Sequence, residues 1–251
     1  MGTERVALVT GGMAGVGCIA EAIARALHDA GHTVLVAHSP HSDRMDKWLA
    51  RQAALGYRYK AYAVDMGDFA ACRRMAGQIA ADGYEVDILV NNAVITRDAP
   101  VLAMGREERG IVMHADLDPV FNVTRQFCDG MVERGWGRIV NIGSAGGAGG
   151  RYGQRNCLAA RAGIHGFTES LAMEVAGHGV TVNTVSSGFA DLPLVASVPK
   201  DAAENKVVPF MPVARSGQRE EIAAMVAFVC RESAAFINGR NFAVHAAQHM
   251  H

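Results

Sequence analysis

The chain has 251 residues, of which half are hydrophobic and 20% are charged, and its formal net charge is −1. This length suits one large α/β domain or two small ones, and the composition is that of a globular protein with a sizeable core. The charge gives no electrostatic case for binding nucleic acid or an anionic membrane, and no apolar run approaches the roughly 20 residues of a membrane span. The opening MGTERVALVTGG lacks the form of a signal peptide, so we expect a cytoplasmic protein.

Short β-branched runs alternate with longer helical patterns along the whole chain, which is typical of βαβ units. Several runs are continuously apolar, as expected of strands covered on both faces. The predicted strands are Val6–Thr10, Thr33–Ala37, Arg58–Val64, Ile88–Asn91, Gly137–Ile142, Val180–Val185 and Asn241–Val244. The predicted helices are about Gly15–Ala30, Asp43–Leu55, Phe69–Ala81, Arg106–Ala115, Pro119–Arg134, Asn156–Ala176 and Arg219–Arg231. No linker interrupts the series, so residues 1–251 are predicted to form one doubly wound α/β domain with a parallel sheet.

The segment after the first predicted strand carries the strongest cofactor signal, Thr10-Gly11-Gly12-Met13-Ala14-Gly15-Val16-Gly17. Glycine leaves room for a phosphate to approach the backbone, and the following helix offers free N–H groups and its positive dipole end. The motif follows a strand and opens a helix within a βαβ unit. It therefore predicts a dinucleotide site rather than only a tight turn.

The end of the second predicted strand favours NADP over NAD. A site for an unphosphorylated ribose places Asp or Glu there, whereas this chain has Ala37-His38-Ser39-Pro40. His38, Ser39 and Arg44 are candidates to contact a 2′-phosphate. The alternative for Arg44 is a solvated residue at a helix start.

The cysteines and histidines show no metal or disulfide pattern. The five cysteines are widely spaced without a CxxC pair, which predicts reduced thiols. Three of the ten histidines crowd the C-terminus, but no spacing fixes a coordination geometry, so we interpret them as an exposed tail and predict no metal site.

Five motifs together resemble those of the short-chain dehydrogenase/reductase family: TGGMAGVG, LVNNAVITRD, GRIVNIGS, GQRNCLAARAGIHGF and VNTVSSGF. The stretches GMVERGWGRIVNIGS, AGIHGFTESLA and QHM are similar to its acetoacetyl-CoA reductase branch, related to the 3-oxoacyl-carrier-protein reductases. The resemblance spans essentially the whole chain. It implies a Rossmann-type domain of about seven strands with helices on both faces, usually a tetramer, in which NADPH reduces a β-keto thioester.

The resemblance also implies the positions of the site residues. Those that would bind NADP(H) are Thr10, Gly11, Gly15, Val16, Gly17, His38, Ser39, Arg44, Asp65, Asn91, Ala93 and Gly188. Those that would contact the acyl thioester are Asp98, Tyr152, Gln154 and Phe189.

Three of the four residues that the family's chemistry needs are replaced. The family uses a Tyr proton donor, a Lys one helical turn later, a Ser that binds the carbonyl and an Asn that anchors a water chain. The Ser is present as Ser144, but the other positions hold Cys157, Arg161 and Asp116. A thiol is far shorter than a phenol, and a missing proton donor costs about 10²–10⁴ in rate. Tyr152, in the preceding loop, is a conceivable replacement donor.

Other departures from the family pattern lie around the cofactor positions. Val94 replaces a glycine after Asn91-Asn92-Ala93, Ser187 replaces a proline before Gly188, and Leu192 replaces a threonine. Near the C-terminus, Ala246-Ala247 replaces a Gly-Gly pair. These changes predict weakened cofactor binding on an intact scaffold.

The substitutions leave several alternatives open. Asp116 and Arg161 form a direct ion pair in place of the proton relay, or they changed independently. Cys157 is a small inert hydrophobe, or Arg161 lowers its pKa and makes it reactive. The chain as a whole is a pseudoenzyme that retains nucleotide binding and assembly, in a homotetramer or with an active relative. Alternatively it is an active NADPH-dependent reductase with rerouted proton donation, or an enzyme that uses Cys157 as a nucleophile.

Overall fold

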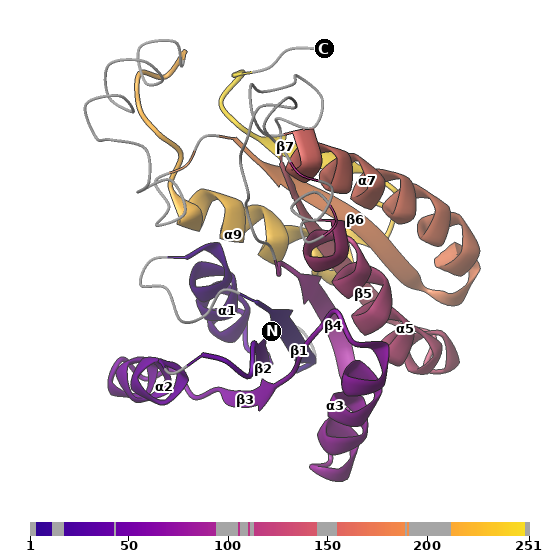
Figure 1. The fold of residues 1–251 in the computed structure, drawn as a ribbon. Helices are drawn as coiled ribbons and strands as arrows, with labels where there is room; N and C mark the ends of the chain where they lie inside the picture. The colour runs from indigo at the N-terminus through magenta and orange to yellow at the C-terminus, as the bar shows by residue number, and fades with distance from the viewer. Residues whose placement is uncertain are drawn as a thin grey trace.

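The computed structural model describes residues 4–11, 18–42, 44–93, 105, 110, 113–144, 155–188, 190 and 212–248, without the side chains of 155–157. In these residues, seven strands form one parallel sheet in the order β3-β2-β1-β4-β5-β6-β7 (Figure 1). The strands are β1 (Val6–Thr10), β2 (Thr33–His38), β3 (Lys60–Ala63), β4 (Val86–Asn91), β5 (Gly137–Ser144), β6 (Val180–Ser187) and β7 (Asn241–Val244).

Helices cover both faces of this sheet (Figure 1). The α-helices are α1 (Ile19–Asp29), α2 (Met45–Ala54), α3 (Phe69–Ala81), α5 (Asp118–Glu133), α7 (Arg155–Val175) and α9 (Arg219–Val229). Two short 3₁₀ helices, η1 (Ala176–His178) and η4 (Glu232–Ala234), follow α7 and α9. The predicted fold class, a doubly wound α/β domain of about seven strands, is confirmed.

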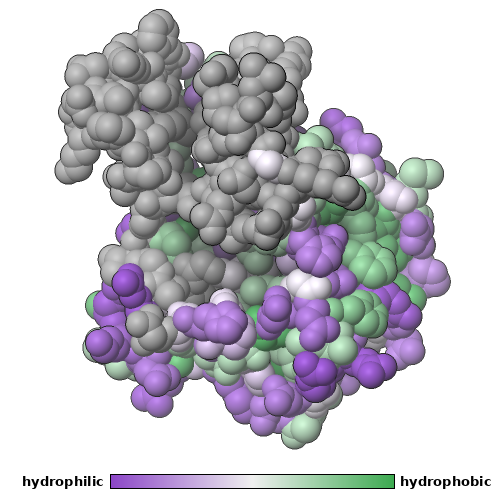
Figure 2. Space-filling view, in the orientation of Figure 1, coloured by the Kyte–Doolittle hydropathy of each residue, from purple (hydrophilic) through white to green (hydrophobic). Residues whose placement is uncertain are grey.

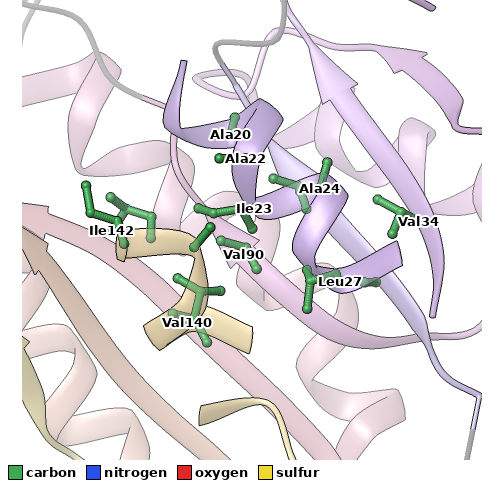
Figure 3. Close-up of a cluster of buried hydrophobic side chains, with 14 of the residues drawn as sticks. Ala20, Ala22, Ile23, Ala24, Leu27, Val34, Val90, Val140 and Ile142 are labelled. Atoms are coloured by element: carbon green, nitrogen blue, oxygen red, sulfur yellow. The ribbon is translucent and has the colours of Figure 1, made fainter. Parts of the chain in front are cut away.

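Two hydrophobic clusters form the core, one on each face of the sheet. The first joins α1, α2 and α9 to strands β1, β2, β4 and β5. Figure 3 shows Ile23 and Leu27 of α1 directed toward Val90 and Val140 of the central strands. The second cluster joins α3, α5 and α7 to the opposite face. The continuous apolar strand sequences follow from this two-sided burial.

Three strands, β3, β5 and β6, have ends that differ from the predicted ones. Strands β5 and β6 each run two residues further than expected, because Ser144 pairs with Ser187 beyond the last apolar residues. Strand β3 is shorter than predicted because its pairing with β2 begins only at Lys60.

Helix α1 begins at Ile19, later than predicted. Cys18 has an extended backbone, with φ −78° and ψ 160°, and its Sγ accepts the N–H of Glu21 as an N-cap. Of the predicted helix 106–115, most lies outside the described residues, although residues 113–116 are helical.

Exposed apolar side chains are intermixed with polar ones on the face shown in Figure 2. Among the exposed apolar side chains of the described residues are Phe69 of α3 and Phe121 of α5, which stack with ring centroids 6.4 Å apart. In the described part of the chain, no helix combines the length and the apolar character needed to cross a membrane.

Candidate functional site

The strand order places the topological switch point of the sheet between β1 and β4. The chain moves from β1 toward β3 on one side and from β4 toward β7 on the other, so the direction of winding reverses between these two neighbours. In open α/β sheets, ligands bind at such a switch point. Hydrogen bonds hold the two strand ends together, because Thr10 Oγ1 accepts the Asn92 N–H at 3.0 Å and Asn92 Nδ2 donates to the Thr10 carbonyl at 3.2 Å.

Gly11 begins the predicted phosphate loop and has no room for a side chain. Its φ is +72°, and an added Cβ would lie 2.8 Å from the Cβ of Ala93. Both constraints require glycine. Four residues predicted to bind the cofactor, Thr10, Gly11, Asn91 and Ala93, therefore meet at one corner, whereas Gly15, Val16 and Gly17 lie outside the described residues.

The residues predicted to contact a 2′-phosphate lie at and after the carboxyl end of β2, the strand next to β1. His38 ends β2, and its Nδ1 lies 2.9 Å from the Ser39 carbonyl oxygen. Ser39 Oγ accepts the N–H of His41 at 3.3 Å, and Arg44 directly precedes α2. Asp65 lies beyond β3, where its Oδ1 accepts the Gly67 N–H at 3.0 Å and closes a turn.

Ser144 and Gly188 lie on the other side of the switch point. Ser144 ends β5 beside Ser187, the last residue of β6, and Gly188 donates its N–H to the Val244 carbonyl at 3.0 Å. The predicted substrate residues Asp98, Tyr152, Gln154 and Phe189 lie outside the described residues.

Arg161 is 5% exposed on α7 and points back into the protein. Its Nη1 donates to the carbonyl of Ile142, two residues before Ser144 on β5. Asp116 is also fully buried, but the direct Asp116–Arg161 ion pair is absent from the ion pairs that described side chains form. Arg161 instead contacts a main-chain acceptor near the end of β5, which favours the alternative that the two positions changed independently. Cys157 lies one turn earlier on α7, and its side chain is outside the described set.

With this geometry in place, the comparisons with known proteins decide the family. The chain matches the family described as enoyl-(acyl carrier protein) reductase over residues 12–246. It belongs to the short-chain dehydrogenase/reductase family.

Several relatives of known name match along nearly their full length. The acetoacetyl-CoA reductase of Cupriavidus necator is 42% identical over 248 residues, which cover 99% of each chain. The acetoacetyl-CoA reductase of Allochromatium vinosum is 39% identical over 98% of this chain and 99% of its own. Nodulation protein G of Azospirillum brasilense is 39% identical over 94% of this chain and 95% of its own. The resemblance inferred from the motifs is confirmed.

His165 lies one turn after Arg161 in this short-chain reductase helix. Its Cε1 lies 3.2 Å from the position that a Cβ on Gly143 would occupy, so the imidazole packs against the backbone just before Ser144. Burial lowers the pKa of His165; the charge of Glu169 opposes this shift and that of Arg161 adds to it. The imidazole is therefore neutral at neutral pH and adds no second positive charge beside Arg161.

A buried chain of polar side chains runs beneath the site and was not predicted. Asn91 Nδ2 donates to Asn141 Oδ1 at 2.9 Å, and Asn141 Nδ2 donates to Thr168 Oγ1 at 2.8 Å. Thr168 Oγ1 lies 2.8 Å from Thr184 Oγ1, so the chain joins β4, β5, α7 and β6. A polar residue inside an apolar strand buried on both faces needs a hydrogen-bond partner, and that signal was available at Asn141.

The described cysteines are buried or partly buried free thiols. Burial raises the pKa of Cys72 to about 11 and that of Cys230 to about 12, and it raises the pKa of Cys18 and Cys128 as well. These four thiols are protonated at neutral pH and are poor nucleophiles. Among the residues with described positions, no three His, Cys, Asp or Glu gather as a metal site would require.

Proposed function

We propose that this chain binds NADPH as a member of the acetoacetyl-CoA reductase lineage, and that its own ketoreductase activity is lost or severely impaired. The lineage is supported by the relatives named acetoacetyl-CoA reductase, which match over almost the whole chain. Because the chain is similar to these reductases, we propose that the substrate of the site would be a 3-oxoacyl-CoA thioester. The impairment is inferred from the residues at the reaction centre.

The residues at the switch point fit a dinucleotide. Gly11 has a positive φ and packs closely against Ala93, so glycine is required for the turn that leads from β1 into the predicted phosphate loop. Residues 37–40, at the end of β2, contain no carboxylate that would repel a 2′-phosphate. When bound, NADPH would supply a hydride. The chain's own residues would have to hold the ketone and deliver the proton.

Arg161 is the observation that carries the proposed impairment. At this position the family places a lysine that holds the nicotinamide ribose and assists the proton donor. Here Arg161 is buried, and its Nη1 donates to the Ile142 carbonyl. A group committed to the backbone of β5 is a poor substitute for a mobile ammonium, because the planar guanidinium also cannot take up the geometry of a lysine.

The residues at two other positions of the reaction centre, Cys157 and Asp116, also argue for impaired ketoreductase activity. Cys157 stands where a tyrosine would donate a proton, and its thiol is several ångströms shorter than a phenol. Asp116 replaces an asparagine, so a group that can donate a hydrogen bond becomes an acceptor when ionised. Ser144 alone remains to bind the carbonyl oxygen.

We further propose that the chain acts in the cytoplasm by assembly, as a homotetramer or together with an active relative. The apolar pattern of its helices supports this role, since it is preserved while the reaction centre is changed. The exposed Phe69–Phe121 pair offers a surface of the kind that subunits bury.

Restoring the three replaced residues tests the proposed impairment. The wild-type protein should bind NADPH in a fluorescence or calorimetric titration but show little oxidation of NADPH with acetoacetyl-CoA. The triple variant Cys157→Tyr, Arg161→Lys, Asp116→Asn should gain at least about 10²-fold in rate, because a positioned proton donor contributes that much.

Adding Ser144→Ala to the triple variant is the matched control and should remove the gain. Wild-type turnover equal to that of the restored variant would contradict the proposed impairment. Failure of the wild-type protein to bind NADPH at millimolar concentration would contradict the nucleotide-binding role.

A further inference from the structure

We propose that Glu21 is a positioning residue that fixes the start of α2 relative to the start of α1, and so favours nucleotides that carry a 2′-phosphate. This inference rests on the proposed binding of NADPH. It concerns a buried carboxylate on α1, away from Ser144 and Arg161.

Glu21 is 3% exposed and is surrounded by donors. Its Oε2 accepts Trp48 Nε1 at 2.9 Å and Arg51 Nη2 at 2.6 Å. Its Oε1 lies 2.9 Å from Arg25 Nη2. A buried carboxylate is costly unless it is paired and hydrogen-bonded, and here two arginines and an indole meet that requirement.

Polar contacts add to the apolar packing that attaches α2 to α1. The buried side chains of α2 are Met45, Trp48 and Gln52. Two of the three bind polar groups of α1, because Trp48 donates to Glu21 and Gln52 Oε1 accepts Arg25 Nε at 2.9 Å. The Trp48 ring also stacks on Tyr59, with centroids 5.4 Å apart and an interplanar angle of 18°. Removing the Glu21 charge would therefore loosen a specific, directional attachment.

Glu21 links the start of α1 to the start of α2, the two segments that would bind the phosphates on the adenosine part of NADPH. It belongs to the first turn of α1, next to the end of the predicted phosphate loop. On the other side, Trp48 donates its backbone N–H to the Arg44 carbonyl at 3.0 Å, one helical turn back. Two successive hydrogen bonds thus connect the start of α1 with Arg44, a candidate contact for the 2′-phosphate.

The placement of α2 also sets the width of a cavity beside this edge. The cavity has a volume of about 430 Å³, and one side is lined by Met45, Asp46 and Leu49 of α2 together with Ser42, which precedes that helix. His38, Ala61 and Ala63 of β2 and β3 form the other wall. A shift of α2 moves the first wall relative to His38, and hence changes the spacing of the groups at the end of β2.

An effect of the Glu21 charge and an effect of its contacts with α2 predict opposite changes in phosphate binding when Glu21 is replaced. The inference is therefore testable. If Glu21 acted only through its charge, Glu21→Gln would strengthen the binding of every phosphate near the start of α1. If Glu21 positions α2, the same change weakens binding of a 2′-phosphate selectively. The two suitable probes are adenosine 2′,5′-bisphosphate and adenosine 5′-monophosphate, which differ only in that phosphate.

The experiment titrates both probes by calorimetry into the wild type, Glu21→Gln and the control Asp29→Asn. Asp29 ends the same helix, so the control removes the same charge at the far end of α1. We expect Glu21→Gln to raise the Kd of the bisphosphate about fivefold or more relative to that of the monophosphate, since the bonds lost are charge-assisted. Asp29→Asn should leave the ratio of the two Kd values unchanged.

Trp48→Phe provides a second variant, which keeps an aromatic ring beside Tyr59 but loses the indole N–H together with part of the buried ring system. It should shift the Kd ratio in the same direction, and the double variant with Glu21→Gln should shift it no further. An unchanged ratio in both single variants, whatever their thermal stability, overturns the inference and leaves the proposed function intact. Wild-type protein that binds neither probe nor NADPH overturns the proposed function and the inference with it.

Discussion

Ala246 and Ala247, just after β7, hold a backbone conformation that glycine adopts without strain. Their φ angles are +48° and +60°, in the left-handed region that L-residues avoid. The resemblance to the family implies that a glycine pair stands at these positions in its other members. Here the turn is made by two alanines, residues that adopt this conformation only with strain.

Returning glycine to either position should stabilise the protein. Left-handed backbone costs an L-residue about 1–2 kcal/mol, and glycine loses about 0.5–1 kcal/mol more conformational entropy on folding, so the net gain is between about 0 and 1.5 kcal/mol per site, centred on about 0.75 kcal/mol. Chemical denaturation of Ala246→Gly and Ala247→Gly measures it. The same substitution at Ala243, within β7, should have the opposite sign; a loss of stability at all three sites would contradict the prediction.

At the scale of the elements, the buried chain of Asn91, Asn141, Thr168 and Thr184 ties three strands to α7. Thr168→Val keeps the shape and removes the hydroxyl that joins Asn141 to Thr184. Because these partners are buried, we expect a loss of about 1–3 kcal/mol in the free energy of unfolding. Thr33→Val is the matched control, since its hydroxyl bonds Glu4 at an exposed site, and should cost less than about 0.5 kcal/mol. Equal losses in the two variants would contradict a special role for the buried chain.

The sequence predicted β1, β7 and α3 with their observed ends, because apolar runs and turn residues bound these elements sharply. It stopped β5 and β6 at their last apolar residues, since the pairing of Ser144 with Ser187 depends on the neighbouring strand rather than on local pattern. The family motifs indicated which residues belong to the site. They could not predict that Arg161 would reach the Ile142 carbonyl, because that contact depends on how α7 packs against β5.

At the scale of the whole molecule, the exposed aromatic pair on α3 and α5 bears on assembly. Phe121 is 52% exposed and stacks on Phe69, which makes the pair costly to leave in water. If the proposed tetramer buries this pair, light scattering should give the mass of four 26.6 kDa chains for the wild type. Phe121→Asp should give a smaller mass, whereas Leu55→Asp, at an exposed site after α2, should not. Wild-type protein with the mass of one chain would contradict the tetramer.

The strand order also has a consequence for the nascent chain. Strands β1, β2 and β3 are neighbours both in the sheet and along the chain, so they can pair once the first 63 residues have been made. The other edge of β1 stays open until β4, which ends at Asn91, has been synthesised. At about 5–20 residues per second, that delay lasts on the order of seconds. The switch point at which the proposed nucleotide would bind lies between these two strands. A growing chain could therefore not be stabilised by that ligand before this point, and until then β1 has an unpaired strand edge.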